Sequence, residues 1–281
     1  MKFEAKMIED SISPSGVRLS TMQLCYPRFV HAEFMTHRVF SRNASSSRAI
    51  PVEKMIQQVR NAPAKPVHWG ANQKGMQAHQ ELDAAGKDYA LDLWIAAAFH
   101  AASIAERMAV LGLHKQVANR ILEPFQWMHV IVTATEWNNF FELRDHADAE
   151  PNIRLLAQLM ETAMSESEPV FRGTDTTEES SWHLPYVTKD ERAHWEDRPE
   201  VLAQISAARC ARVSYLTHDG QRPNYQKDLA LYDRLVGSRP LHASPVEHQA
   251  WPMPFGMGDG FSGNFRGWHQ FRKQIEAEME S

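Results

Sequence analysis

The stretch MTHRVFSRNASSSRAIP, from Met35 to Pro51, holds three arginines, one histidine and four serines among a few apolar residues. Arginine guanidinium groups bind phosphates and carboxylates through paired hydrogen bonds and stay charged at every working pH. Serine hydroxyls and loop amides can complete a cradle for an anion. By composition alone, this stretch is either a binding site for a phosphorylated ligand or a solvated basic loop.

The whole chain has the composition of an ordinary globular protein. Its 281 residues include 43% hydrophobic residues and 8 tryptophans, which is enough for one large core or two modest ones. The net charge of −5 argues against a nucleic-acid partner. No apolar run approaches the roughly 18 to 20 residues that span a bilayer, and the first residues lack the apolar region of a signal peptide. We therefore expect a cytoplasmic protein with no membrane partner.

The cysteine content limits the kinds of site that the chain can form. Its two cysteines, Cys25 and Cys210, are too few for a disulfide framework or a four-thiolate zinc site. We expect both to be buried as small hydrophobic residues. No metal site is predicted.

Apolar residues in the first part of the chain recur with the spacings of both strands and helices. Residues 17–35 mix β-branched and aromatic residues with polar ones, which predicts two strands joined by a short connection. Residues 82–111 carry apolar residues at helical spacing, which predicts a long core helix that closes near Gly112. Further helices are expected over 51–61, 114–122, 136–146 and 152–164, with a loop rich in Pro, Gly and Asn over 62–75.

The composition changes between residues 165 and 200. This stretch is acidic, polar and dotted with proline, which predicts a surface excursion or linker rather than core. Beyond it, residues 201–215 and 225–237 are expected to be helical, and a glycine-rich stretch leads into a final amphipathic segment. Because helices and strands alternate, the predicted fold class is α/β or α+β.

The opening stretch resembles the signature of the flavin-dependent thymidylate synthases, the ThyX family, whose pattern is RHRxxSxNExSxRY. Just before it, PRFVHAEFM aligns without gaps on the family's strand of the type PIFVARQWF, with Glu33 in place of its glutamine. This resemblance favours a ligand-binding site over a solvated loop. Six of the nine fixed positions of the signature match, at His37, Arg38, Ser41, Asn43, Ser46 and Arg48.

Two further blocks resemble the same family. KQVANRILEP, residues 115–124, is similar to KEQARxxLP and aligns Arg120 with the family's arginine. NNFFELRDHADAEPNIR, residues 138–154, is similar to NFLxLRxxxxAQWEIR, with Asn139 and Arg144 matching. The blocks together are more specific than any one of them.

A fourth resemblance stands late in the chain, although in the family it comes first. AARCARVSY (207–215) and PLHASPVEHQAW (240–251) are similar to the motifs AARVSY and HxSPFEH, which in the family precede the signature. We therefore predict a circularly permuted ThyX-like sheet with flanking helices, because permutation is mild where the old termini lie close together. The expected single catalytic domain, 1–281, comprises the signature and helical part (18–165), an acidic connecting excursion (166–200) and the family's former N-terminal part (201–281). Residues 63–87 lie outside the resemblance.

The resemblance implies functional roles residue by residue. A deoxypyrimidine monophosphate, dUMP, would be bound by Ser46, Arg48, Arg120 and Arg144, with Glu33 beside it, and Ser46 and Arg144 would also serve in catalysis. A doubly charged phosphate and a polarisable pyrimidine carbonyl both suit guanidinium donors. FAD would be bound at the subunit interfaces of a homotetramer by His37, Arg38, Asn43, Asn139, Ser214, His242 and Ser244.

The implied chemistry needs no protein nucleophile. In the family, reduced flavin relays a one-carbon unit from methylenetetrahydrofolate to C5 of dUMP, giving dTMP, and NADPH supplies the reducing equivalents. The unrelated class of thymidylate synthases attacks with a thiolate in a Pro-Cys-His setting. Neither Cys25, in LCYP, nor Cys210, in ARCARV, has that setting.

Departures from the family pattern leave the product open. Such exchanges change which polar groups of a bound nucleotide can be satisfied. Two alternatives therefore remain: a flavin-dependent hydroxymethylase of dUMP or dCMP, and a homologue that binds nucleotide or flavin without turnover. The retained arginines argue against the second alternative. The departures are Thr36 for the signature's first arginine, Ala44 for its glutamate, Ala49 for its tyrosine and Glu33 for the upstream glutamine.

Overall fold

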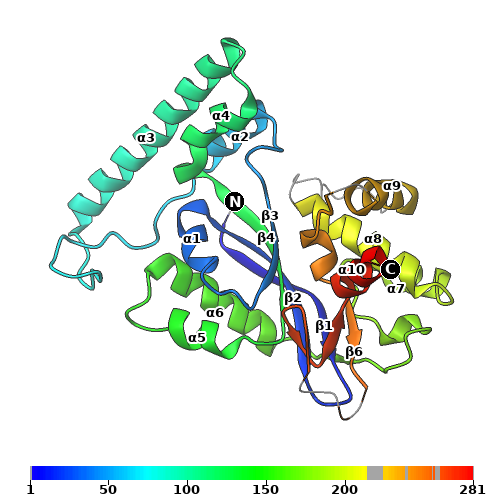
Figure 1. The fold of residues 1–281 in the computed structure, drawn as a ribbon. Helices are drawn as coiled ribbons and strands as arrows, with labels where there is room; N and C mark the ends of the chain where they lie inside the picture. Colours follow the sequence, from blue (N-terminus) through cyan, green and yellow to red (C-terminus); the bar gives the residue numbers. More distant parts are fainter. Residues whose placement is uncertain (1, 214–223, 238–239, 255, 257–259, 281) are drawn as a thin grey trace.

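A five-stranded sheet of order β3-β4-β2-β1-β5 forms the centre of the molecule (Figure 1). The computed structural model describes residues 2–213, 224–237, 240–254, 256 and 260–280. Neighbouring strands pair antiparallel except β5, which adds to β1 in parallel, so the predicted mixed α/β class is confirmed. The strands are β1 (Glu4–Ile12), β2 (Arg18–Pro27), β3 (Ser41–Ala44), β4 (Trp127–Ala134) and β5 (Val170–Phe171).

Two helices cover one face of the sheet. Successive side chains of a strand point to opposite faces, and Met22 and Leu24 of β2 join Val130 of β4 on the covered face. There they pack against α5 (Asn138–Arg144) and α6 (Pro151–Ser165), as Figure 1 shows. Both helices agree with the predicted ranges.

A C-terminal layer, residues 182–280, covers the opposite face. Ile131 of β4 packs with Cys210 and Val213 of this layer. The helices predicted over 201–215 and 225–237 and the final amphipathic segment are confirmed among the described residues. The layer contains α7 (Lys189–His194), α8 (Pro199–Arg212), α9 (Tyr225–Val236), α10 (Phe271–Glu280), the 3-10 helix η5 (Ser244–Glu247), and the short strands β6 (Ala250–Pro252), β7 (Phe261–Ser262), β8 (Phe265–Arg266) and β9 (Trp268–Gln270).

A buried chain of hydrogen bonds joins the C-terminal layer to the sheet. The His183 imidazole bonds to Ser11 Oγ at 2.9 Å and to Thr21 Oγ1 at 2.7 Å. Thr21 bonds in turn to Thr133 at 2.7 Å, and Thr133 to His248 Nδ1 at 2.8 Å. Burial lowers the pKa of His248 to about 3 and that of His183 well below its usual range. Both imidazoles are therefore neutral links in this chain.

A helical arm extends away from the sheet (Figure 1). Its long helix, α3 (Ala84–Val110), was expected to be a core helix, and this holds for one of its faces only. Only alanines between Ala98 and Ala105 are buried, because α2 (Val52–Asn61) and the 3-10 helix η2 (Asn119–Phe125) cover one face alone. Trp94, Met108 and Ala109 are partly buried against the same cluster, whereas Tyr89, Leu93, Phe99 and Val110 are exposed. The expected helix over 114–122 is split into α4 (Lys115–Ala118) and the start of η2.

Two further expectations differ from the structure. The second strand expected within 17–35 is wrong, since residues 28–34 form the 3-10 helix η1 (Arg28–Val30) and the short helix α1 (His31–Phe34). Val30 and Phe34 are both buried, and a spacing of four residues belongs to a helix.

The acidic stretch is not only a surface excursion. Trp182, His183 and Leu184 are buried, and the side chain of Arg172 pairs with Glu9 of β1 at 2.5 Å. Charged side chains can be buried when they are paired with an opposite charge. The charged residues of this stretch can therefore belong to the core. The stretch contains β5, the 3-10 helix η3 (Glu179–Ser181) and α7.

Candidate active site

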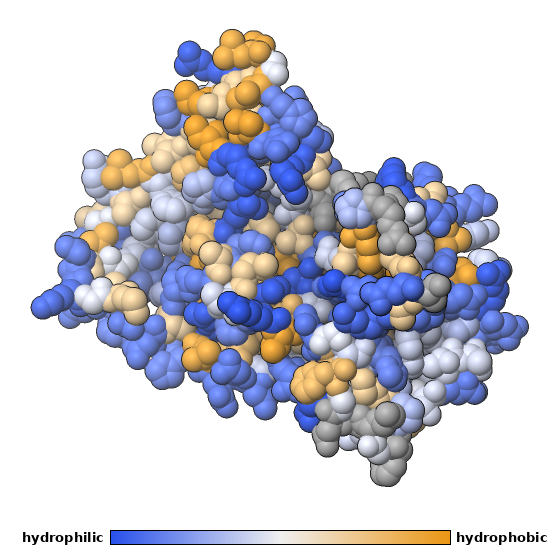
Figure 2. Space-filling model, viewed as in Figure 1, coloured by the Kyte–Doolittle hydropathy of each residue, from blue (hydrophilic) through white to orange (hydrophobic). Residues whose placement is uncertain are grey.

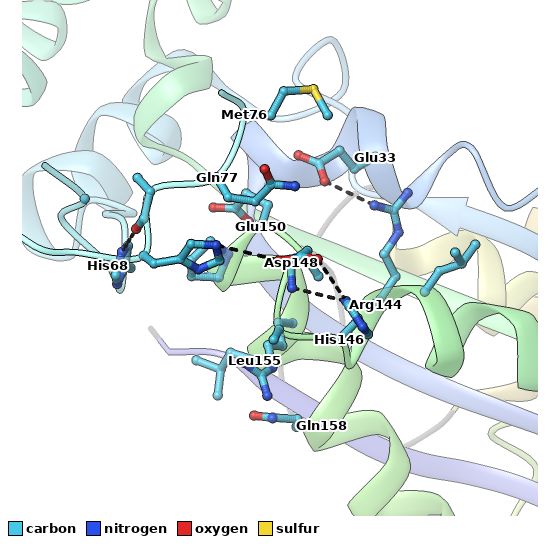
Figure 3. A pocket seen from close by; sticks show the side chains of 18 of the residues that line it. Glu33, His68, Met76, Gln77, Arg144, His146, Asp148, Glu150, Leu155 and Gln158 are labelled. Atoms are coloured by element: carbon cyan, nitrogen blue, oxygen red, sulfur yellow. Dashed lines mark hydrogen bonds and ion pairs between the residues drawn. The ribbon is translucent and has the colours of Figure 1, made fainter. Parts of the chain in front are cut away.

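A groove of about 1280 Å³ lies between two loops beside the sheet (Figure 3). Residues 68–79 of the connection between α2 and α3 form one wall. The end of α5, the following loop and the start of α6 form the other wall. Polar and charged side chains line most of it, including Glu33, Arg144 and Glu150. The groove is thus a polar cavity with charges of both signs.

Arg144 is held at the groove by three side chains of one segment. Its Nε donates to Nε2 of His37 at 3.0 Å, and its Nη2 donates to Thr36 Oγ1 at 3.1 Å. Its Nη1 lies 3.5 Å from Glu33 Oε2. Since three contacts from one short segment restrain the guanidinium, its position is defined before any ligand arrives.

The charges around Arg144 shift two neighbouring groups. Burial, followed by the positive charges of Arg144 and Arg42, lowers the pKa of His37. A neutral His37 whose Nε2 accepts from Arg144 carries its proton on Nδ1. Burial and then Glu150 raise the pKa of Glu33, while Arg144 opposes that rise.

Arg42 of β3 donates hydrogen bonds to the backbone of the same segment. Its Nη1 donates to the carbonyl oxygens of Phe34, Met35 and His37 at 3.4, 3.2 and 3.0 Å. These carbonyls lie at and just after the end of α1, and two of them also accept backbone hydrogen bonds, that of Phe34 from the amide of His37 and that of His37 from the amide of Phe40. Sequence reasoning missed this role, although an arginine between the buried Ser41 and Asn43 of a strand is a signal for it.

Ser46, Arg48 and Arg120 do not line this groove. Arg48 is exposed, and within the described residues it makes no ion pair or hydrogen bond. Arg120 pairs with Glu123 at 2.9 Å, and Glu123 also pairs with Arg28 at 3.0 Å. These residues form a second, basic region beside η2.

The signature strand and the C-terminal layer meet at Asn43. Its Nδ2 donates to the carbonyl oxygen of Cys210 at 2.7 Å, and its Oδ1 accepts from Ser244 Oγ at 3.3 Å. The structure therefore brings together two of the predicted cofactor residues that lie far apart in the sequence. Arg38, Asn139 and His242 are exposed, and Ser214 lies outside the described residues.

The cysteines are placed as expected. Cys25 and Cys210 are buried and free, and neither lines the groove. Burial raises the pKa of Cys25 to about 12 and raises that of Cys210 as well. Both are protonated at neutral pH and are poor nucleophiles. Across the residues that the structure describes, no group of three or more His, Cys, Asp or Glu could hold a metal ion.

Sequence reasoning also missed the wall formed by residues 68–79. Residues 68–75 were predicted only as loop, 76–79 were assigned no structure, and the whole segment lies outside the family resemblance. Its length was the available signal, because long connections without secondary structure in compact domains are often functional.

Comparisons with known proteins bear on the identity of the chain. A family model described as thymidylate synthase complementing protein, Thy1, matches residues 17–170, more than half of the chain. No curated protein matches this chain. The match ends before the C-terminal layer, so the predicted circular permutation stays a prediction.

In the part of the chain that is described, no helix has the length and apolarity of a bilayer span.

Among solved structures, two forms of one protein are similar to this chain. A UMP/dUMP methylase PolB from Streptomyces cacaoi bound with 5-Br dUMP aligns with 16% identity and a TM-score of 0.49, over 59% of this chain and 90% of its own. The same methylase bound with 5-Br UMP aligns with 16% identity and a TM-score of 0.48, over 59% and 89%.

Proposed function

Because this chain belongs to the thymidylate synthase complementing protein family, we propose that it transfers a one-carbon unit from methylenetetrahydrofolate to C5 of dUMP. The product would be dTMP, with FAD as cofactor and NADPH as reductant. The observation that carries this proposal is the restrained guanidinium of Arg144 at the polar groove.

Arg144 would act on the pyrimidine ring. As C5 becomes nucleophilic, negative charge builds on a ring carbonyl oxygen, and a guanidinium placed beforehand stabilises that charge. The interaction is stronger in the transition state than in the bound ground state, which raises kcat. Glu33 and His37 would keep Arg144 in place, and Glu33 would offer an acceptor beside it.

Ser46, Arg48 and Arg120 would bind the phosphate. Arg48 has a guanidinium without a protein partner among the described residues, and a phosphate takes two parallel hydrogen bonds from such a group. Since these residues do not line the groove of their own chain, we infer that they complete the groove of another subunit. This agrees with the homotetramer that the family resemblance implies.

Exposed apolar residues on the arm support a subunit contact. Figure 2 shows apolar side chains gathered over the end of α3. A large apolar patch on a protein surface usually indicates a site of contact with another protein. The exposed large apolar residues of the arm are Tyr89, Leu93 and Phe99 along α3, and Val110, Leu111, Leu113, Val117 and Ile121 at and after its end.

The donor set near the signature fits a flavin dinucleotide. Arg38 is exposed and pairs with no described carboxylate, so its guanidinium is available to a pyrophosphate. His37, Asn43, Asn139, His242 and Ser244, together with Ser214, would provide the remaining polar contacts. When bound, FAD would supply the redox chemistry and carry the one-carbon unit. The protein side chains would orient it and the nucleotide.

One observation favours a second candidate function, hydroxymethylation of dUMP or dCMP. Glu33 is a carboxyl group with a raised pKa at the groove, where the family has a neutral glutamine. A carboxylate of raised pKa can accept a proton from a water molecule, and water rather than hydride ends the hydroxymethylase reaction.

A single incubation distinguishes these candidates. The purified protein is supplied with FAD, NADPH, methylenetetrahydrofolate and either dUMP or dCMP, and the nucleotide product is analysed by mass spectrometry. A methylated uracil nucleotide supports the first proposal, and a hydroxymethylated nucleotide supports the second. Binding of nucleotide and flavin without any product would leave only a non-catalytic homologue.

A further inference from the structure

The wall of the groove opposite Arg144 is held in place by hydrogen bonds. We call residues 70–79 the groove loop. Its base is pinned by the pairing of Gly70 with Glu81 and by a bond from the amide of Ala71 to the carbonyl of Gln80 at 2.7 Å. Just before it, the amide of Val67 donates to Asn152 Oδ1 of α6 at 3.0 Å. The first two contacts close the base of the groove loop, and the bond from Val67 ties the segment before it to the helix that forms the opposite wall.

The tip of the groove loop presents two side chains to the groove. Gly75 turns the chain with a φ of 111°, a conformation that favours glycine, and Met76 and Gln77 follow it. Met76 is 95% exposed although it lines the groove. Figure 3 shows both side chains on the side opposite the helix that carries Arg144.

Gln77 has an amide without a protein partner. It is half-buried, and within the described residues its carboxamide makes no hydrogen bond, whereas its backbone carbonyl accepts from Gln73 Nε2 at 2.5 Å. A half-buried amide gains by pairing with a ligand that can both donate and accept.

The charged side chains at this end of the groove cannot do the same. The guanidinium of Arg144 only donates, and the carboxylates of Glu33 and Glu150 only accept when ionised. A uracil ring presents an N–H directly beside a C=O, and a carboxamide matches that pair with two parallel hydrogen bonds. Gln77 is the neutral side chain at the groove loop tip with this capacity.

We propose that Gln77 binds the edge of the pyrimidine ring, its Oε1 accepting from N3–H and its Nε2 donating to the adjacent carbonyl, while Met76 covers the ring. This inference rests on the proposed function, because it assumes that the groove receives a uracil nucleotide. It assigns base recognition to a segment that lies outside the family resemblance. The neutral amide that is absent at Glu33 would then be supplied by the groove loop.

The test measures dUMP binding to the full chain by calorimetry, in the presence of FAD. We expect Gln77→Ala to weaken dUMP binding roughly 10- to 100-fold, the loss of two neutral hydrogen bonds. Gln77→Glu keeps the size but loses the donor, and it should bind dUMP at least as weakly. The matched control is Gln80→Ala, on the same segment but outside the groove, with binding within about twofold of wild type.

A modified ligand tests whether Gln77 binds the N3–H of the nucleotide. 3-Methyl-dUMP lacks the N3–H, so wild type should bind it more weakly than dUMP, whereas Gln77→Ala should bind the two alike. An equal preference for dUMP in both proteins, or wild-type affinity in Gln77→Ala, overturns this inference alone. If the wild-type protein binds no dUMP at all, the proposed function fails together with it.

Discussion

Nε2 of His37 accepts a hydrogen bond from Nε of Arg144 at 3.0 Å. The bond joins a residue that the resemblance assigns to FAD with one that it assigns to the nucleotide. It also keeps His37 neutral, since an imidazolium has no acceptor nitrogen. If both assignments hold, the two ligands meet across this contact, and the loss of either side chain should affect both binding sites.

The first prediction concerns Arg144 itself. Arg144→Lys keeps the charge but loses the planar fork that contacts His37 and Thr36 together. We expect kcat to fall by roughly 10² to 10³, comparable to the loss of one oxyanion donor. Steady-state kinetics with flavin occupancy measured in parallel checks this, and FAD content should change little. Arg60→Lys, at a surface pair with Glu106, is the control. A near wild-type kcat for Arg144→Lys would remove this residue from the active site.

The second prediction concerns Arg42 as a positioning residue. Arg42→Met removes the donor to three carbonyl oxygens behind Arg144. Unfolding should become easier by about 1 to 3 kcal/mol, because three carbonyls lose a charge-assisted hydrogen bond. At a temperature where the variant stays folded, kcat should fall while the KM of dUMP changes less, since Arg144 loses its fixed position. A purely structural role for Arg42 predicts lower stability with an unchanged kcat.

The third prediction concerns the cofactor. The purified protein, equilibrated with FAD, should show flavin absorbance, and Arg38→Gln or His242→Ala should reduce flavin occupancy. The physical reason is that both side chains are exposed beside the signature and Arg38 has a guanidinium available to a pyrophosphate. A protein that stays colourless and shows no heat of FAD binding would contradict the cofactor assignment.

The fourth prediction is that both cysteines are dispensable for turnover. Cys25 and Cys210 are buried, and burial raises the pKa of each thiol. A double variant, Cys25→Ala with Cys210→Ala, should lose about 1 to 2 kcal/mol of stability and keep its kcat. Thermal unfolding and initial rates check the two halves separately. A folded double variant that binds both ligands without turnover would point to a thiolate mechanism.

The fifth prediction is a pH dependence of stability. His183 and His248 stay neutral in the folded protein because burial lowers their pKa values, that of His248 to about 3. Unfolded histidine takes up a proton near pH 6.5, so below that pH the unfolded state binds more protons and stability falls. We expect a loss of about 1 kcal/mol for each of these histidines as the pH drops from roughly 6.5 to 5.5, with the slope approaching about 1.4 kcal/mol per pH unit at lower pH.

Urea unfolding at several pH values measures this slope. His248→Gln removes one of several histidines whose pKa is lowered by burial, so the slope should become shallower by the share of that residue, although overall stability is lower. An identical slope in wild type and His248→Gln would show that His248 does not contribute.

Local pattern in the sequence determined much of the framework. The apolar periods of 136–146 and 152–164 predicted α5 and α6, and the cysteines were expected to be buried. Asn139 and Arg144 both lie on α5, within the helix expected over 136–146, and a separation of five residues directs their side chains differently. These features depend on neighbours within a few residues, which the sequence specifies directly.

Tertiary structure alone decided the features that depend on distant partners. The apolar period of α3 is genuine, but only packing shows that α2 and η2 cover a single face of it. Asn43 contacts Ser244, and Arg42 donates hydrogen bonds to the segment that holds Arg144. No local pattern in the sequence predicts that these elements lie close together.

The groove loop is the clearest case of this division. The proline, glycine and asparagine content of 62–75 predicted only an irregular connection, because such residues favour turns in many contexts. The orientation of Gln77 toward the groove depends on the anchoring of Gly70 and Val67 to other segments. The sequence by itself determined which chemical groups the protein has and which helix or strand carries most of them. Only the folded chain decided which groups face the same cavity, since long-range packing and hydrogen bonds set their final positions.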